Sequence, residues 1–299
     1  MSDKKTGVFP PGIHTAIVTP FSGGGIDVTS FRELLRIQKN SAVSGVVVLG
    51  TTGEAPTVTA KEREELIKTA AAALGKKKTL TVGCGSNDTA QACEKVKEAA
   101  ALGADFALVV APYYNRPSQR GLLRHFITVA DASPVPVIVY NVPSRTGADV
   151  SAETLSVLSS HPNVAAVKEA STDLQSVTSK MAEAPELHFF CGSDTLLLHF
   201  LCLGGKGGIS VSSNLDPDKT CAVYERFAGG DLPGARDAFF SLYPYLKALG
   251  CDTNPVPIKA VMAARGLISA HVRQPLCELP EQVKAKLLYT ASDAGIYVR

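Results

Sequence analysis

The chain has 299 residues, 45% of them hydrophobic, and a formal net charge of +2 at pH 7. This composition is typical of a globular protein, and the near-neutral charge argues against a nucleic-acid-binding or membrane-binding surface, so we expect a small-molecule partner. The seven cysteines form no Cys-x-x-Cys pair and the amino terminus has no apolar signal core, which predicts reduced thiols in a cytoplasmic protein.

Short β-branched apolar runs recur along the chain, and each is followed by a polar or glycine-rich stretch and then a helix-like segment. In chain order the runs are 15–21, 45–50, 79–85, 106–112, 135–141, 164–170, 187–192 and 207–213. Continuous apolarity over a run is typical of a strand covered on both faces, as in a parallel sheet wrapped by helices. The pattern therefore predicts a parallel sheet whose strands alternate with helices.

The intervening segments have helical periodicity and recognisable helix ends. Thr59 is a predicted N-cap, with Glu62 three residues later as its capping-box partner. A second helix is expected to end at Gly103, and a third to begin at Ser151 and stop before Pro162.

Eight strand–helix units within about 225 residues match the size of a (β/α)8 TIM barrel. A doubly wound open sheet is the alternative, but no G-x-G-x-x-G turn follows the first run. We therefore expect an α/β fold with the barrel over residues 1–213. Residues 214–299 are expected to supply a closing helix and a C-terminal helical extension packed on the barrel.

Polar residues that follow the apolar runs are the candidates for the active face, because the carboxyl ends of barrel strands carry the active site. They are Thr51, Thr52, Glu54, Tyr113, Tyr114, Tyr140, Asn141, Arg145, Lys168, Ser193 and Asp194. The histidines lack metal-site spacing, and no G-x-S-x-G elbow indicates a hydrolase. The glycines of "GGKGG" (204–208) leave a phosphate-binding barrel open as an alternative.

Lys168 directly follows the apolar run 164–167, where a charged amine is unexpected. Apolar surroundings disfavour an ammonium ion, and a neutral amine can attack a ketone to form a Schiff base. The alternative is a salt bridge from Lys168 to Glu169 or to another carboxylate at the barrel mouth.

The neighbouring candidates favour the Schiff base. Tyr140 ends the preceding strand, so its phenol can approach Lys168 and carry protons. Thr51 and Thr52 place hydroxyl and N–H groups at a sharp turn, where they suit a carboxylate or a proton relay. Arg145 can hold a carboxylate with two hydrogen bonds, although an exposed loop arginine is an equal alternative.

Five motifs, in this order along the chain, carry a family resemblance: "GTTGE" (50–54), "APYYNRPSQ" (111–119), "YNVPSRTG" (140–147), "VKEAS" (167–171) and "NPVPIK" (254–259). Together they resemble the dihydrodipicolinate synthase and N-acetylneuraminate lyase family of class I aldolases, which use pyruvate. The resemblance covers nearly the whole chain. It is greatest to members that condense pyruvate with L-aspartate 4-semialdehyde to 4-hydroxy-tetrahydrodipicolinate, on the diaminopimelate route to lysine.

The resemblance implies catalytic roles for four residues. Lys168 would form the imine with pyruvate, so that no metal or organic cofactor is needed. Tyr140, Thr51 and Tyr114 would form a proton relay. Tyr114 would reach in from a neighbouring subunit of a homotetramer, a dimer of dimers.

The substrate-binding residues implied by the resemblance are Thr52, Arg145, Ile209 and Gly192. Thr52 would help to hold the pyruvate carboxylate, Arg145 would hold that of aspartate semialdehyde, and the backbone at Ile209 would line the site. Gln91 stands where lysine-sensitive members have an acidic residue, so we expect weak inhibition by L-lysine or none.

Besides the phosphate-binding barrel, two other functions stay open at this point. The first is a lyase or aldolase of the same family that acts on a sialic acid, a sugar acid or 4-hydroxy-2-oxoglutarate. The second is a non-catalytic barrel that binds small oxo acids.

Overall fold

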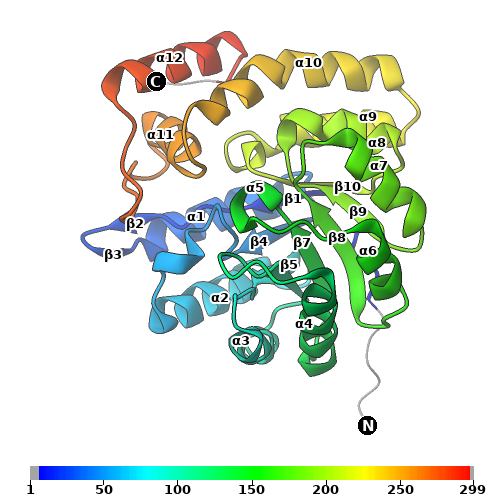
Figure 1. The fold of residues 1–299 in the computed structure, drawn as a ribbon. Helices are drawn as coiled ribbons and strands as arrows, with labels where there is room; N and C mark the ends of the chain where they lie inside the picture. The colour runs from blue at the N-terminus through cyan, green and yellow to red at the C-terminus, as the bar shows by residue number, and fades with distance from the viewer. Residues whose placement is uncertain (1–6, 297–299) are drawn as a thin grey trace. The chain divides into compact units, whose positions relative to one another are not determined.

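The computed structural model of the chain describes residues 7–296 and has the (β/α)8 TIM barrel that the sequence predicts (Figure 1). The barrel strands are β1 (Gly12–Ala16), β4 (Gly45–Val48), β5 (Thr79–Gly83), β6 (Phe106–Val110), β7 (Val137–Asn141), β8 (Val164–Glu169), β9 (His188–Cys191) and β10 (Gly207–Ser210). They form a closed ring in the order β1-β10-β9-β8-β7-β6-β5-β4. Every residue of β1, β4 and β7 is buried, which explains the continuous apolar runs.

The first strand was placed wrongly, because β1 spans Gly12–Ala16 and not residues 15–21. Ile17 and Val18 are buried although they lie beyond the strand. The backbone N–H of Val18 donates to the side-chain oxygen Oδ1 of Asn214 (3.0 Å) and not to a neighbouring strand. An apolar run reports burial, and here burial continues after the strand has ended.

The described chain divides into two compact units built from non-contiguous segments. The first contains residues up to 11 together with 79–209, and the second contains residues 12–78 together with 210 onwards. The expected division into 1–213 and 214–299 separates the barrel strands from the C-terminal helices along the sequence. It does not describe compact units, and it stays a prediction.

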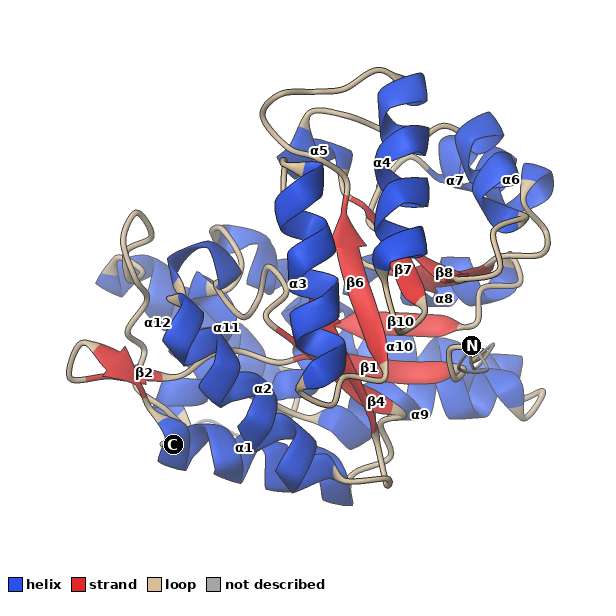
Figure 2. Cartoon of the chain, turned by 90° about the horizontal axis from the view of Figure 1, so that it is seen from below, coloured by secondary structure: helices blue, strands red, loops and turns tan. Residues whose placement is uncertain are grey.

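In the first unit, helices follow the strands in sequence. They are α3 (Thr89–Ala101), α4 (Gln119–Ala132), α5 (Pro143–Thr146), α6 (Ala152–Ser159), α7 (Leu174–Glu183) and α8 (Leu197–Cys202). Figure 2 shows α3 beside β6, with α4 packed against α3. The predicted end signals are confirmed: the Ser151 side chain accepts from the Thr154 N–H to cap α6, and α3 ends two residues before Gly103.

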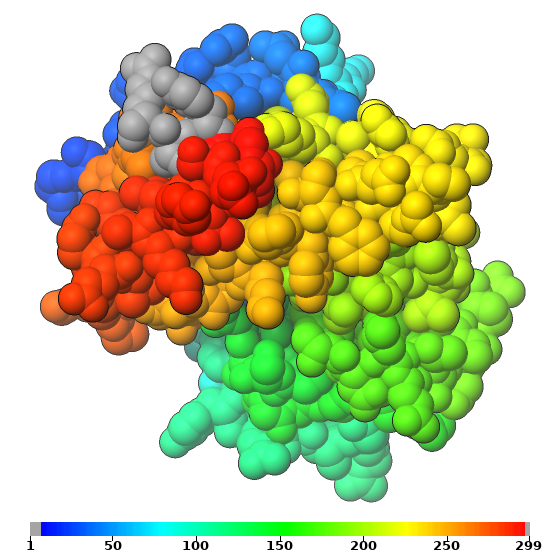
Figure 3. Space-filling view, turned by 90° about the horizontal axis from the view of Figure 1, so that it is seen from above, coloured from blue at the N-terminus to red at the C-terminus, as the bar shows by residue number. Residues whose placement is uncertain are grey.

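The second unit contains the predicted helix with the capping box of Thr59 and Glu62, α2 (Ala60–Leu74), as well as the helices expected after the last strand. Its other long helices are α1 (Val28–Asn40), α9 (Pro217–Ala228), α10 (Leu232–Ala248), α11 (Val256–Ala264) and α12 (Glu281–Asp293). Helices α10 and α12 lie side by side in the space-filling view (Figure 3).

A small antiparallel hairpin of the second unit, β2 (Phe21–Ser22) with β3 (Gly25–Ile26), was not predicted. Its strands have two residues each and are separated by glycines, so no apolar alternation marks them. Among the described helices, none is long and apolar enough to span a membrane.

An ion pair joins the start of α2 to the C-terminal segment of the same unit. Both terminal nitrogens of Arg273 donate to the carboxylate of Glu62, at 2.8 and 2.5 Å. These hydrogen bonds lower the pKa of Glu62 from 4.5 to about 2. Because the folded state favours the ionised carboxylate, this contribution to stability is present above pH 4.5 and is lost as the pH falls towards 2.

Replacing Glu62 by Gln should lower the free energy of unfolding near neutral pH by about 1–3 kcal/mol, since the charge-assisted hydrogen bonds with Arg273 are lost while the amide oxygen can still accept in the capping box. The difference from the wild type should shrink between pH 5 and pH 3, as measured by urea unfolding at several pH values. Glu64→Gln, which breaks an exposed pair with Lys68 on the same helix, is the matched control and should change stability little. A Glu62→Gln effect of equal size at pH 3 and pH 7 would contradict this assignment.

Candidate active site

Strands β7 and β8 place Tyr140 next to Lys168. These two residues are partners in the register, and Asn141 and Glu169 are partners one position further along. Because successive side chains of a strand point to opposite faces, the two pairs lie on opposite faces of the sheet. Tyr140 and Lys168 are 6% and 5% exposed, and the lysine Nζ lies 4.4 Å from the centroid of the tyrosine ring. The expected nucleophile and the expected proton carrier are therefore in contact.

The salt bridge from Lys168 to Glu169, which the sequence left open, is not formed. Glu169 pairs with Lys180 of α7 at 3.1 Å on the other face of the sheet. Within residues 7–296, no carboxylate lies within ion-pair distance of Lys168. Its amine rests on the face of the Tyr140 ring, where a cation–π interaction holds it without a counter-ion.

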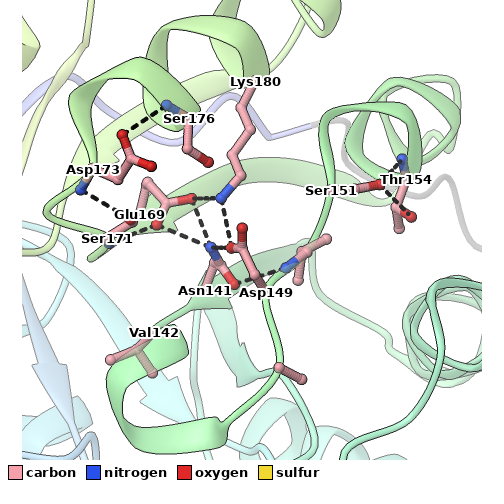
Figure 4. A network of polar contacts seen from close by, with 12 residues as sticks. Asn141, Val142, Asp149, Ser151, Thr154, Glu169, Ser171, Asp173, Ser176 and Lys180 are labelled. Atoms are coloured by element: carbon pink, nitrogen blue, oxygen red, sulfur yellow. Dashed lines mark hydrogen bonds and ion pairs between the residues drawn. The ribbon is translucent and has the colours of Figure 1, made fainter.

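A polar network occupies the outer face behind this pair (Figure 4). The side-chain amide of Asn141 donates to both carboxylate oxygens of Glu169, at 3.0 and 2.8 Å, and to Asp149 at 2.6 Å. Lys180 donates to Asp149 at 2.6 Å and to Glu169 at 3.1 Å. Burial raises the pKa of Glu169, and the charge of Lys180 opposes this shift. The network thus satisfies a carboxylate that is completely buried.

Arg145 lies on the short helix α5, just after β7, and its side chain is exposed. The helix ends at Gly147, whose φ of +71° is a left-handed conformation that suits glycine. The Gly147 carbonyl accepts a hydrogen bond from Nε of Arg116 at 2.8 Å. The "YNRPS" and "SRTG" segments are therefore tied together next to the carboxyl end of β7.

Tyr114 follows β6 and is 89% exposed, whereas its neighbour Tyr113 is 39% exposed. Tyr114 also has a φ of +72°, which is strained for a residue with a bulky side chain. The side chain therefore projects away from its own chain.

Gly192 and Ile209 complete the expected residues of this unit. The N–H of Gly192, just after β9, donates to the Glu169 carbonyl at 2.7 Å. A Cβ at Gly192 would lie 2.8 Å from Cβ of Ala170 and 3.0 Å from the same carbonyl, so only glycine fits without a shift. Ile209 lies in β10 and is fully buried.

The "GTTGE" turn belongs to the second unit and follows β4. Thr51 is half-buried and Thr52 is buried. Glu54 closes the turn with a φ of +52°. The hydroxyl of Thr52 accepts from the side-chain amide of Asn254 at 3.0 Å.

Glu54 of the turn is buried and forms an ion pair with Lys259 of α11, which is also buried. Burial lowers the pKa of Lys259, and its contact with Glu54 opposes this shift. The backbone N–H of Arg273 donates to the second oxygen of Glu54 at 2.9 Å. The C-terminal part of this unit therefore holds the turn in place.

The glycine-rich "GGKGG" segment (204–208) runs into the amino end of β10 and includes its first two residues, whereas Lys168 lies near the carboxyl end of β8. A phosphate bound there would be at the wrong end of the barrel for the active face. Among the described residues, no three His, Cys, Asp or Glu side chains are grouped as metal ligands would be.

The chain matches the model of the dihydrodipicolinate synthetase family over residues 10–294. It belongs to this family. A curated relative, the 4-hydroxy-tetrahydrodipicolinate synthase of Kosmotoga olearia, is 41% identical over 289 residues, which are 95% of this chain and 98% of the relative.

Solved structures of family members agree closely with the fold. The dihydrodipicolinate synthase of Thermotoga maritima has a TM-score of 0.94 at 36% identity, with 96% of this chain and 99% of that chain covered. The enzyme of Acinetobacter baumannii, solved in complex with pyruvate, has a TM-score of 0.93 at 34% identity, with 97% and 100% covered. Both likenesses extend over nearly the whole of each chain.

Four residues that support the candidate site of this dihydrodipicolinate synthetase family member were not predicted from the sequence. Asp149 and Lys180 come from a loop and from a helix face, where neither spacing nor composition distinguishes them. Lys259 and Asn254 lie within the "NPVPIK" motif, but nothing in the sequence connects them with the "GTTGE" turn. Gln91 is exposed on α3, and insensitivity to lysine stays a prediction.

The space at Gly192 generates a stability prediction. Gly192→Ala should lower the free energy of unfolding by about 1–3 kcal/mol, because β8 and its following residue must move to admit the methyl group. Gly250→Ala is the control, since a Cβ there would meet no atom within 4 Å. Urea unfolding of both variants measures the difference, and equal stability would show that the contact at Gly192 is not restrictive.

Proposed function

We propose that the chain is a Schiff-base aldolase that condenses pyruvate with L-aspartate 4-semialdehyde to give 4-hydroxy-tetrahydrodipicolinate. The observation that carries the proposal is the buried Lys168 amine, which rests on the Tyr140 ring and has no carboxylate partner among the described residues. The relatives that share nearly the whole chain are synthases of this name, which favours this acceptor over a sialic acid, a sugar acid or 4-hydroxy-2-oxoglutarate.

The first half of the reaction is imine formation. The amine of Lys168 attacks C2 of pyruvate, the carbinolamine loses one water, and C3 then loses a proton to give an enamine. These steps move protons at the nitrogen, at the C2 oxygen and at C3, and we assign their transfer to Tyr140, whose ring lies against the amine. The imine is itself the electron sink, so the step requires neither a metal nor an organic cofactor.

The second half begins when C3 of the enamine attacks the aldehyde carbon, whose oxygen takes up a proton. The amino group of the bound semialdehyde then attacks C2, closes the ring and displaces the amine of Lys168. The residue that we assign to the acceptor carboxylate is Arg145, whose planar guanidinium can donate two parallel hydrogen bonds. Thr52, Gly192 and Ile209 are assigned to the pyruvate side of the site.

The proton relay is assigned to Tyr140, Thr51 and Tyr114, with Tyr114 supplied by a neighbouring subunit. Tyr114 is 89% exposed and has a strained backbone, and a side chain held outward in this way suits insertion into another molecule. The active unit would then be at least a dimer, and we propose a homotetramer built as a dimer of dimers.

Borohydride reduction in the presence of pyruvate tests the covalent step. Intact-mass and peptide mass spectrometry should find one pyruvate-derived adduct per chain, on Lys168. Lys168→Arg should give no adduct, and Lys180→Arg, which changes another buried lysine of the same unit, should retain it. Absence of an adduct from folded wild-type protein would exclude the Schiff-base mechanism.

Arg145 variants test the identity of the acceptor. Arg145→Ala should reduce kcat/KM for aspartate semialdehyde about 100-fold, a typical loss when one member of a charged hydrogen-bonded pair is removed, and leave pyruvate adduct formation intact. Arg145→Lys, which keeps the charge but not the planar fork, should recover only part of the activity. If Arg145→Ala retained full activity, the acceptor assignment would be wrong, and a longer sugar-acid substrate would become the better candidate.

A further inference from the structure

We propose that Asp149 is a positioning residue for the second half-reaction, because it ties the segment carrying Arg145 to the strands that carry Tyr140 and Lys168. The inference deepens the proposed function and rests on the roles assigned there to Arg145 and Lys168. Asp149 lies on the outer face of the sheet and touches neither residue, so its effect is exerted through the backbone.

The segment after α5 is fixed at Asp149 by contacts from several elements. Its carboxylate oxygen Oδ1 accepts from Asn141 of β7 and from Lys180 of α7, both at 2.6 Å. Its backbone carbonyl accepts from the side chain of Gln119 at the start of α4, at 2.7 Å. The next N–H, that of Val150, donates to Asn141 at 3.0 Å. This anchor follows Arg145 by four residues.

The same network reaches the covalent lysine from behind. Asn141 and Lys180 both also bind Glu169, and Glu169 in turn accepts from the N–H of Ser171 at 2.7 Å. Glu169 is the next residue after Lys168, and Asn141 is the next after Tyr140. One set of side chains therefore holds the ends of β7 and β8 and the loop between Arg145 and α6 (Figure 4).

The role of Asp149 differs from that of the buried ion pair between Glu169 and Lys180, because the charges of that pair balance without it. Glu169 and Lys180 are 0% and 2% exposed and already neutralise each other, so burial of the pair does not require a second carboxylate. Asp149 is 45% exposed, and its removal leaves Lys180 paired with Glu169. What is lost is the side-chain part of the attachment, the two hydrogen bonds from Asn141 and Lys180, while the backbone contacts of Asp149 and Val150 remain. Asp149 is therefore a link in position and not a requirement for folding.

The experiment compares the two half-reactions in Asp149→Ala. Because the imine forms before the aldehyde reacts, kcat/KM for pyruvate and kcat/KM for aspartate semialdehyde report on separate steps. We expect the value for the aldehyde to fall about 10-fold, while the value for pyruvate and the borohydride adduct on Lys168 stay within about twofold of wild type. Asp149→Asn keeps an oxygen acceptor for Lys180 and should recover most of the loss.

The matched control is Glu183→Ala. Glu183 is an exposed carboxylate at the end of α7 that lines the same surface hollow as Asp149 and Lys180. It should leave both kinetic constants unchanged, which separates the effect of the anchor from that of removing one negative charge. Thermal unfolding of every variant identifies a general loss of stability.

A double-mutant cycle with Arg145→Ala decides whether Asp149 acts through Arg145. The double variant should be no worse towards the aldehyde than Arg145→Ala alone, because there is then no guanidinium to position. Additive losses, equal losses in both half-reactions, or an unchanged aldehyde constant in Asp149→Ala would each overturn the proposal. A wild-type protein that formed no pyruvate adduct would overturn the proposed function itself, so the two failures are distinguishable.

Discussion

The pairing of β7 with β8 is the constraint on which the rest of the site depends. Its register sets Tyr140 opposite Lys168, and the two-residue period of a strand then sets Asn141 opposite Glu169 on the other face. A shift of one residue would exchange the faces of the sheet on which the two pairs lie. The polar network on the outer face therefore supports the geometry of the amine and the phenol on the inner face.

The second condition is that the carboxylate next to Lys168 is neutralised by another residue. A buried Glu169 without a cation would attract the nearest amine or take up a proton, and Lys168 is its neighbour along the chain. Lys180 of α7 supplies the positive charge from outside the sheet, and Asn141 supplies two further hydrogen bonds. Lys168 is thereby left to rest on an aromatic ring and not in an ion pair.

The second unit also has a buried ion pair, which holds the "GTTGE" turn. Glu54 ends the "GTTGE" turn in a left-handed conformation and is held by Lys259 and by the backbone of Arg273. Thr52 is held by Asn254. The residues after the last strand therefore have a definite task within this unit, which is to fix the turn that carries Thr51 and Thr52.

The sequence by itself determined the barrel, seven of its eight strands to within a few residues, and Lys168 and Tyr140 as neighbours, because continuous apolar runs and strand order follow from local chemistry. The sequence misplaced β1, because Ile17 and Val18 are buried although they lie beyond the end of the strand. Only the tertiary structure decided which lysine neutralises Glu169, because Lys168 and Lys180 are both close to it in the chain. The pairing of Glu169 depends on which face of β8 packs against α7. It also depends on Asp149, which lies in a loop where the sequence has no periodic pattern.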